Sequence, residues 1–292
     1  MKSFISILFI LSMLLYSVSL KGQCTGCTTL IAGGSSNFSV NPGQVVCIAA
    51  DLTYTGNITL NGGVLCNQGT LTRVVFKSGT FNNYGTFNKS GGLTITNSGN
   101  LFINCYAGST FSMSSGLSLV SSNINDSVVV RNNPGSLFTT GTGLSMHNTK
   151  FSLYNGNSSL SGPNAVFNVG AAFSITDSTE FKLRNYESGI FNVSGSLTFN
   201  SAGNKSLLNN GTFNVNNAVT MSGTGNLTDR ISIINNGNFN VTGNISTAII
   251  NTGVNILNNS GATLSSGISI TLSKTTNTLV NNGTILIGQD FI

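Results

Sequence analysis

The chain has 292 residues, of which 35 are glycine and only 7% are charged, whereas charged residues make up about 25% of an average soluble domain. Good helix formers such as Ala, Glu, Lys and Gln are scarce, which excludes a mainly helical fold. The 39% share of hydrophobic residues argues against disorder. The formal charge of +5 falls to +3 if Lys2 and Lys21 leave with a leader, and the other cations are scattered, so we expect no nucleic-acid partner.

The first residues have the pattern of a signal peptide. Lys2 precedes an apolar run from Phe4 to Tyr16, and Ser17-Val18-Ser19 resembles a small-residue cleavage site. The apolar run is short for a membrane span. We therefore predict a signal peptide over 1–22 and an exported mature chain without a membrane span. Its expected location is extracellular or at the cell surface, with the periplasm as the alternative.

The cysteines all lie in the N-terminal part of the chain, where disulfides are permitted if the protein is exported. Cys24 or Cys27 bonded to Cys47 would fasten the segment 23–56, which lies outside the repeat described below and is predicted to cap the first coil. An odd total predicts one buried or unpaired thiol. Cys24-x-x-Cys27 is half of a zinc-site pattern, but no second such pair follows, so no metal site is predicted. The five cysteines are Cys24, Cys27, Cys47, Cys66 and Cys105.

From residue 57 onward, apolar residues recur at intervals of about 25 residues, which is typical of stacked coils. A second apolar series follows six residues behind the first, and near Leu264 we expect this offset to shorten to four, at Ile268. The first series is Phe87, Phe111, Phe138, Phe167, Phe191, Phe213, Phe239, Leu264 and Ile285. The second series is Leu93, Leu117, Leu144, Phe173, Leu197, Val219 and Ile245.

Apolar and polar residues alternate around both series, as in Phe213-Asn214-Val215, which predicts strands with one buried face. A third apolar segment completes most coils, as in Phe181-Lys182-Leu183. Corners such as Asn209-Asn210-Gly211-Thr212 recur between coils, where Asn and Gly tolerate a positive φ and stacked amides can form a ladder. The sequence therefore predicts an all-β fold: a right-handed parallel β-helix over 57–292, with about nine coils of three short strands.

The last predicted coil has no polar capping segment, and an open parallel edge favours association. We expect another copy, a partner or a further domain to cover it.

Two outward rows of hydroxyl and amide side chains are predicted along the coils. They form a candidate ligand face for polysaccharide or, less favoured, for ice. The row on the strand of the second series is Thr94, Ser118, Ser145, Ser174, Thr198, Thr220, Ser246 and Ser269. The row on the strand of the first series is Asn88, Ser112, Thr139, Asn168, Asn192, Asn214, Asn240 and Ser265.

The segment Asn57-Ile58-Thr59-Leu60-Asn61-Gly62-Gly63 is followed by Cys66-Asn67-Gln68-Gly69-Thr70 and by Asn-x-Gly-Thr-Phe repeats. Together these motifs resemble secreted, cell-surface repeat proteins of Bacteroidetes, over nearly the whole mature chain. The resemblance implies an adhesin-like role. Export by the type IX route, which the resemblance also implies, would need a C-terminal sorting domain that these residues do not contain.

Parallel β-helices also include polysaccharide lyases and hydrolases, which need clustered carboxylates. The one acidic cluster surrounds Glu180, where Lys182 and Arg184 are predicted to project outward beside it, and we interpret it as a solvated charged face. His147 is predicted to face outward without catalytic partners. We therefore predict no catalytic residue, no cofactor and no metal. The expected function is a non-catalytic scaffold, with a polysaccharide-binding or polysaccharide-cleaving protein as the alternative.

Overall fold

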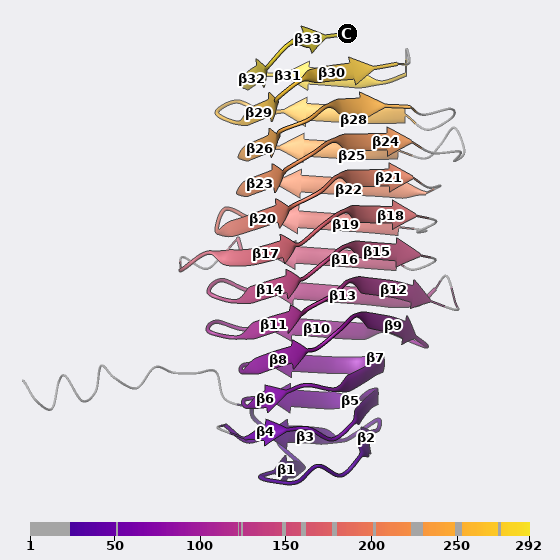
Figure 1. The fold of residues 1–292 in the computed structure, drawn as a ribbon, viewed down its shortest axis with the longest axis vertical. Helices are drawn as coiled ribbons and strands as arrows, with labels where there is room; N and C mark the ends of the chain where they lie inside the picture. Colours follow the sequence, from indigo (N-terminus) through magenta and orange to yellow (C-terminus); the bar gives the residue numbers. More distant parts are fainter. Residues whose placement is uncertain are drawn as a thin grey trace, which may run out of the picture.

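The computed structural model describes residues 24–292 except 51, 122, 124, 148–149, 159–161, 177–179, 201–202, 223–229, 249–252 and 274–275. The predicted signal peptide lies outside the described residues. The described residues form strands β1 to β33 and no helix, and every pairing between strands is parallel (Figure 1). The predicted all-β solenoid is therefore confirmed.

The strands belong to three sheets, named A, B and C. Sheet A holds β1 (Thr29–Ile31), β2 (Phe38–Val40), β3 (Val45–Ile48), β5 (Ile58–Asn67), β7 (Val74–Asn83), β10 (Leu101–Cys105), β13 (Ser127–Asn132), β16 (Lys150–Asn155), β19 (Glu180–Asn185), β22 (Asn204–Asn209), β25 (Arg230–Asn235), β28 (Gly253–Asn258) and β31 (Thr278–Asn281). Sheet B holds β4 (Thr53–Tyr54), β6 (Thr70–Leu71), β8 (Thr86–Lys89), β11 (Thr110–Met113), β14 (Leu137–Thr140), β17 (Ala165–Val169), β20 (Gly189–Val193), β23 (Thr212–Val215), β26 (Asn238–Val241), β29 (Thr263–Ser266) and β32 (Thr284–Ile287). Sheet C holds β9 (Leu93–Asn97), β12 (Leu117–Ser121), β15 (Leu144–His147), β18 (Phe173–Thr176), β21 (Leu197–Asn200), β24 (Val219–Ser222), β27 (Ile245–Thr247), β30 (Ser269–Leu272) and β33 (Asp290–Phe291).

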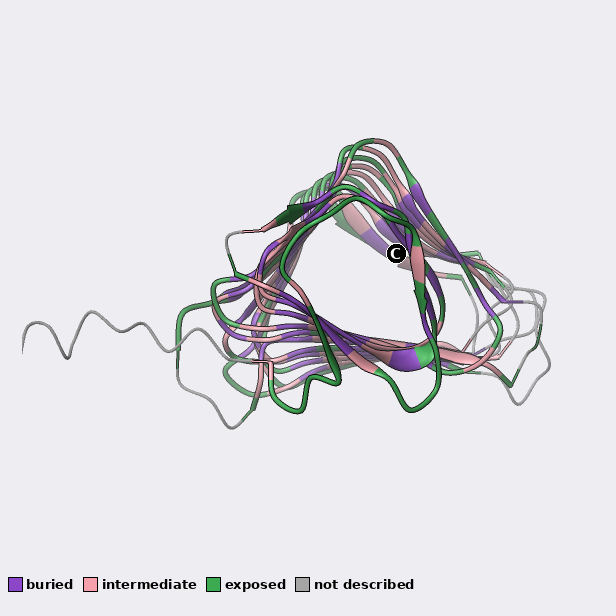
Figure 2. Cartoon of the chain, turned by 90° about the horizontal axis from the view of Figure 1, so that it is seen from below, coloured by how far each residue is buried: buried purple, intermediate pink, exposed green. Residues whose placement is uncertain are grey.

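Each regular coil contributes one strand to sheet A, then one to sheet B and one to sheet C, as β10, β11 and β12 do. Seen along the axis, the three sheets form a triangular outline, and buried residues alternate with less buried ones along the strands (Figure 2). In Figure 1 the strands of sheets B and C cross the near face from left to right. Sheet A returns on the far side while the chain climbs, which is the right-handed winding expected from the sequence.

The core is built on the predicted phenylalanine series. Phe111, Phe138, Phe167, Phe191 and Phe213 are paired in register in successive strands of sheet B, and each is 0% exposed. Their rings lie nearly parallel, with centroids 4.4–4.8 Å apart between neighbours. Parallel strands repeat at about 4.8 Å, so an in-register aromatic column stacks without changing its rotamer. The predicted register of the first series is confirmed.

The second series is also in register, but the predicted shortening of its offset is wrong. Ile245 pairs with Ile270, which is 0% exposed, whereas Ile268 is 40% exposed. Ile268 lies in the turn between β29 and β30, where its carbonyl accepts a bond from the Gln289 amide. The turn between sheets B and C therefore has the same length here as in the other coils. The prediction failed because an apolar residue of the turn was assigned to the inward position.

The segment 24–56 joins the solenoid through parallel pairs. β1 pairs with β3, β3 with β5, and β4 with β6. Cys27 is bonded to Cys47, which is one of the two pairings that the sequence left open. Cys24 is bonded to Cys66, a pairing not foreseen because no pattern in this irregular segment indicates that β5 lies over β3. Cys105 is free and buried, as the odd count predicted.

At the other end, β31, β32 and β33 are the last strands of sheets A, B and C among the described residues. Leu286 and Phe291 on these strands are 56% and 60% exposed. Partner association at this coil stays a prediction.

A ladder of buried asparagines closes the corner between sheets A and B. From Asn132 through Asn155 to Asn185, each side-chain Nδ2 donates to the next Oδ1 at 2.8 Å. The same Nδ2 atoms donate to carbonyls of sheet B, as Asn185 does to Thr212 at 2.9 Å. The ladder continues through Asn209, Asn235 and Asn258 to Asn281. The predicted amide ladder is therefore confirmed, and it satisfies polar groups that would otherwise be costly to bury.

The glycines of these corners serve a purpose other than the predicted one. Gly211, Gly237 and Gly283 do not adopt a positive φ. A Cβ on Gly237 would lie 2.2 Å from the Gly211 carbonyl oxygen of the preceding coil. Glycine is needed here because neighbouring backbones approach closely.

Cys105 stands where other coils carry asparagine. It pairs with Asn83 on one side and Asn132 on the other. Burial raises the pKa of its thiol from the ordinary 9.0 to about 12, while a hydrogen bond with Asn83 acts in the opposite direction. The ladder is thus interrupted at one coil by a neutral thiol.

We predict that Asn185→Ala lowers the free energy of unfolding by roughly 3 kcal/mol, because Asn155 Nδ2 loses one of its two acceptors and the buried Asn209 Oδ1 loses its ladder donor. Asn192→Ala is the matched control, since Asn192 lies in the outer ladder of sheet B between Asn168 and Asn214. Its expected cost is about 1 kcal/mol or less. Guanidinium denaturation measures both. Equal losses of stability in the two variants would show that the buried ladder contributes no more than the outer ladder does.

Replacing Cys27 and Cys47 by serine is expected to destabilise the N-terminal coils by about 3 kcal/mol, from the loop that the disulfide closes. Coils of a solenoid contact only their neighbours, so the effect should stay local. Hydrogen exchange should accelerate in β1 and β3 and remain unchanged in β22 and β25. Uniform acceleration along the chain would contradict this local effect.

The buried Cys105 thiol should also make the free energy of unfolding depend on pH. Its pKa is raised in the folded protein, so its contribution to stability is complete below pH 9 and is lost as the pH rises towards 12, at about 1.4 kcal/mol per pH unit. Cys105→Asn should remove this slope and join Asn83 to Asn132. Denaturation curves of both proteins between about pH 8 and 11 test it, and parallel curves would contradict it.

Candidate ligand-binding faces

The predicted hydroxyl row on sheet C is a continuous column. Thr94, Ser118, Ser145 and Ser174 are paired in register on β9, β12, β15 and β18. The column continues through Thr198, Thr220 and Ser246. These residues alternate with buried ones, so their side chains face outward as predicted.

The last predicted member of this row, Ser269, is wrong. Ser246 pairs with Thr271, which continues the row. Ser269 belongs to the preceding corner position, where its hydroxyl donates to the Oδ1 of Asn244 at 3.1 Å. The error has the same origin as that at Ile268, because both placements assumed a shortened turn.

A shallow groove of about 360 Å³ runs across four coils beside this row. It is lined by Thr94, Ser118, Ser145 and Ser174 on one side, and every lining residue is uncharged. The row predicted from the sequence therefore forms the wall of a real depression over its first four members.

The groove exists because its floor lacks side chains. The corner residues before β9, β12 and β15 are Gly92, Gly116 and Gly143, and Ala172 follows before β18. Backbone bonds stack this corner, as the Leu117 amide donates to the Gly143 carbonyl at 3.0 Å. Later coils carry Ser196, Ala218 and Asn244 at the same position. Glycine at three consecutive corners thus leaves the floor without side chains, and the groove ends before the coil that carries Ser196.

The predicted row on sheet B is a hydrogen-bonded surface rather than a free one. Asn192 donates to Asn168, Asn214 to Asn192 and Asn240 to Asn214, at 2.8–2.9 Å. Ser265 donates to Asn240 at 3.1 Å. Because each amide is engaged with the next coil, this row stabilises the sheet and offers a ligand fewer free donors than the groove does.

The charged cluster lies on the outer face of sheet A, as predicted. Phe181 and Leu183 are 0% exposed, while Lys182 and Arg184 are exposed. Lys182 and Glu180 form an ion pair at 2.5 Å. The register places Lys150 and Asn204 beside Glu180, so neither neighbouring coil contributes a second carboxylate there. His147 is exposed after buried Met146, in the predicted orientation.

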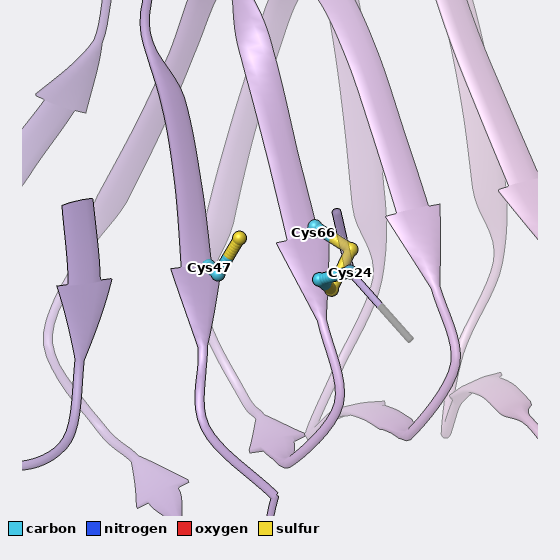
Figure 3. A group of neighbouring side chains, drawn as sticks. All are labelled: Cys24, Cys47 and Cys66. Carbon is cyan, nitrogen blue, oxygen red and sulfur yellow. A yellow bond between two sulfur atoms is a disulfide. The ribbon is translucent and has the colours of Figure 1, made fainter. Parts of the chain in front are cut away.

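Three cysteine sulfurs, those of Cys24, Cys47 and Cys66, lie within 4.8 Å of one another (Figure 3). Metal binding requires thiolates, but Cys24 and Cys66 are bonded to each other and Cys47 to Cys27. The cluster is therefore two adjacent disulfides that fasten the first coils.

Sequence reasoning missed a group of aromatic and cationic residues on the outer face of sheet A. Tyr84 and Tyr106 stack with ring centroids 4.1 Å apart. Burial raises the pKa of Tyr84 to about 12, and the neighbouring Tyr106 contributes a smaller rise in the same direction. Arg131 lies over the Tyr154 ring, 5.4 Å from its centroid. Their positions in the sequence were an available signal, because each of these residues directly precedes or follows the buried ladder position of its coil.

In comparisons with known proteins, no family model, no curated protein and no solved structure matches this chain. No helix in the described part of the chain is long and apolar enough to cross a membrane.

Proposed function

We propose that the chain is an exported, non-catalytic scaffold with an adhesin-like role at the cell surface or in the cell envelope, and that it binds polysaccharide through its outer face. The observation that carries this proposal is the uncharged, hydroxyl-lined groove along Thr94, Ser118, Ser145 and Ser174. The two disulfides support an oxidising, exported location.

The shape of the groove favours a long, neutral, hydroxylated ligand. Its hydroxyl groups repeat once per coil, at about 4.8 Å, along a straight line. Each hydroxyl can donate one hydrogen bond and accept others, directly or through water. A ligand with repeating hydroxyls can use the same contact at each coil, whereas a compact ligand would use only one.

The inter-coil bonds support the scaffold role. The buried asparagine ladder, the aromatic column and the disulfides hold the coils in one register. Such a rod presents a preformed surface, which lowers the ordering cost of binding. Ice binding is less favoured because the row mixes serine with threonine and borders a hollow instead of a plane.

A glycan array with the purified mature protein tests the proposal, followed by titration of the best neutral glycan. Ser118→Leu should weaken binding about tenfold by blocking the groove. Thr220→Leu is the matched control, since Thr220 lies in the same row beyond the groove, and it should change the affinity less than about twofold. Loss of affinity in both variants, or binding to no neutral glycan, would contradict the groove as the site.

The absence of catalysis is tested separately by a lyase and hydrolase screen with the glycans that bind. We expect no turnover. Cleavage that Glu180→Gln or Lys182→Ala abolishes would overturn the scaffold proposal, and thermal hysteresis above background would favour ice binding.

A further inference from the structure

The outer face of sheet A carries a second surface, separate from the groove on sheet C. On neighbouring coils, Arg131 of β13 pairs with Tyr154 of β16, which pairs with Arg184 of β19. Phe102 lies on β10, beside these residues. Aromatic and cationic side chains therefore alternate along the solenoid axis, on a chain whose surface is otherwise mostly hydroxyl and amide.

Arg131 is held in place by aromatic rings. Its guanidinium carbon lies 5.4 Å from the centroid of Tyr154 and 5.9 Å from that of Phe102. Cation–π contact positions the planar group without using its hydrogen-bond donors. Among the described residues, neither Arg131 nor Arg184 has a carboxylate partner. Two guanidinium groups are therefore left to bind an external anion.

A small pocket of about 270 Å³ adjoins Arg131. The corner position after the buried ladder position carries Tyr106 (after Cys105), Asn133 and Tyr186 in other coils, but Gly156 in this one. Gly156 has a φ of +85°, and a Cβ there would lie 2.8 Å from the Ser188 hydroxyl oxygen, so glycine lets the next coil approach closely beside the pocket. The pocket is lined by Arg131, Asn133, Tyr154, Gly156, Asn157 and Tyr186.

The lining residues have the chemistry of a site for an acidic sugar. Tyr186 offers an apolar ring with a polar tip, which suits the C–H face and hydroxyls of a pyranose, while the Tyr154 ring holds Arg131. The Arg131 fork matches a carboxylate with two parallel hydrogen bonds.

We propose that this pocket binds a carboxylate-bearing sugar residue, and that the row from Arg131 to Arg184 holds an acidic polysaccharide along the solenoid axis. Arg131 and Arg184 are two coils apart, about 10 Å, so a single extended chain can reach both. The site is distinct from the neutral groove on sheet C and goes beyond the proposed function, because it adds a second face with a different ligand class.

Calorimetric titration with a β-1,4-linked glucuronate hexasaccharide tests the proposal. Cellohexaose is the matched probe, because the two sugars differ only in having a carboxylate or a hydroxymethyl group at C6. We expect binding of the glucuronate that weakens with added salt, and about tenfold weaker binding or none for cellohexaose at this site.

Arg131→Gln should reduce the affinity for the glucuronate at least tenfold by removing the carboxylate partner, and Tyr154→Leu should reduce it similarly by removing the ring. Lys182→Gln removes the same charge from the same face but outside the pocket, and should change the affinity less than about twofold. Circular dichroism and unchanged thermal midpoints would show that the three variants fold.

Ser118→Leu, which blocks the groove on sheet C, should leave glucuronate binding unchanged, so failure of one site is distinguishable from failure of the other. Equal losses in Lys182→Gln and Arg131→Gln would reduce the effect to general attraction and overturn the pocket. Equal affinity for both hexasaccharides would overturn the carboxylate assignment. Tighter binding of single-stranded DNA than of glucuronate, which aromatic and arginine side chains can also support, would overturn the ligand class.

Discussion

Every inward side chain of this solenoid lies directly over the equivalent side chain of the preceding coil, so each core position must suit a copy of itself at about 4.8 Å. A phenylalanine column meets this condition by stacking, as between Phe138 and Phe167, whose centroids are 4.5 Å apart. Asparagine meets it by donating to the next amide, as Asn155 does to Asn185. Lys205 is an exception, since it is 1% exposed between Phe181 and Ile231 and its ammonium group donates to the Gly203 carbonyl instead.

The same constraint explains which features could be predicted. Inward columns are visible in the sequence because register preserves their spacing, and the six-residue offset between the inward residues of sheets B and C persists even where the coil length varies. Phe167, Phe191 and Phe213 were placed correctly for that reason. The failures at Ile268 and Ser269 arose where an exposed apolar residue in a turn imitated an inward position. A rule requiring constant turn length would have selected Ile270.

Outward residues are harder to predict, because the stacking of coils does not restrict which side chain occupies an outward position. The wall of the groove was predicted from the alternation around Ser118 and Ser145, but its floor was not, since Gly116 and Gly143 look like ordinary turn glycines. The stack of Tyr84 and Tyr106 and the contact between Arg131 and Tyr154 were missed for a related reason. Neighbours on the outer face are about 25 residues apart in the chain, and the varying coil length hides which of them meet.

Departures from the repeat are consequently the most informative positions on this fold. Where a column keeps one residue type, as in the buried asparagines, stability is a sufficient explanation. Gly156 breaks a corner column of tyrosine and asparagine, and a pocket opens beside it. Three glycines open the groove on sheet C in the same manner. These glycines also let neighbouring coils approach closely, since a Cβ on Gly116 would lie 2.9 Å from the Gly143 carbonyl oxygen and one on Gly156 would lie 2.8 Å from the Ser188 hydroxyl oxygen. Close packing explains the glycines but does not require a hollow lined by hydroxyl groups or by Arg131, and we therefore interpret both hollows as places where a ligand binds.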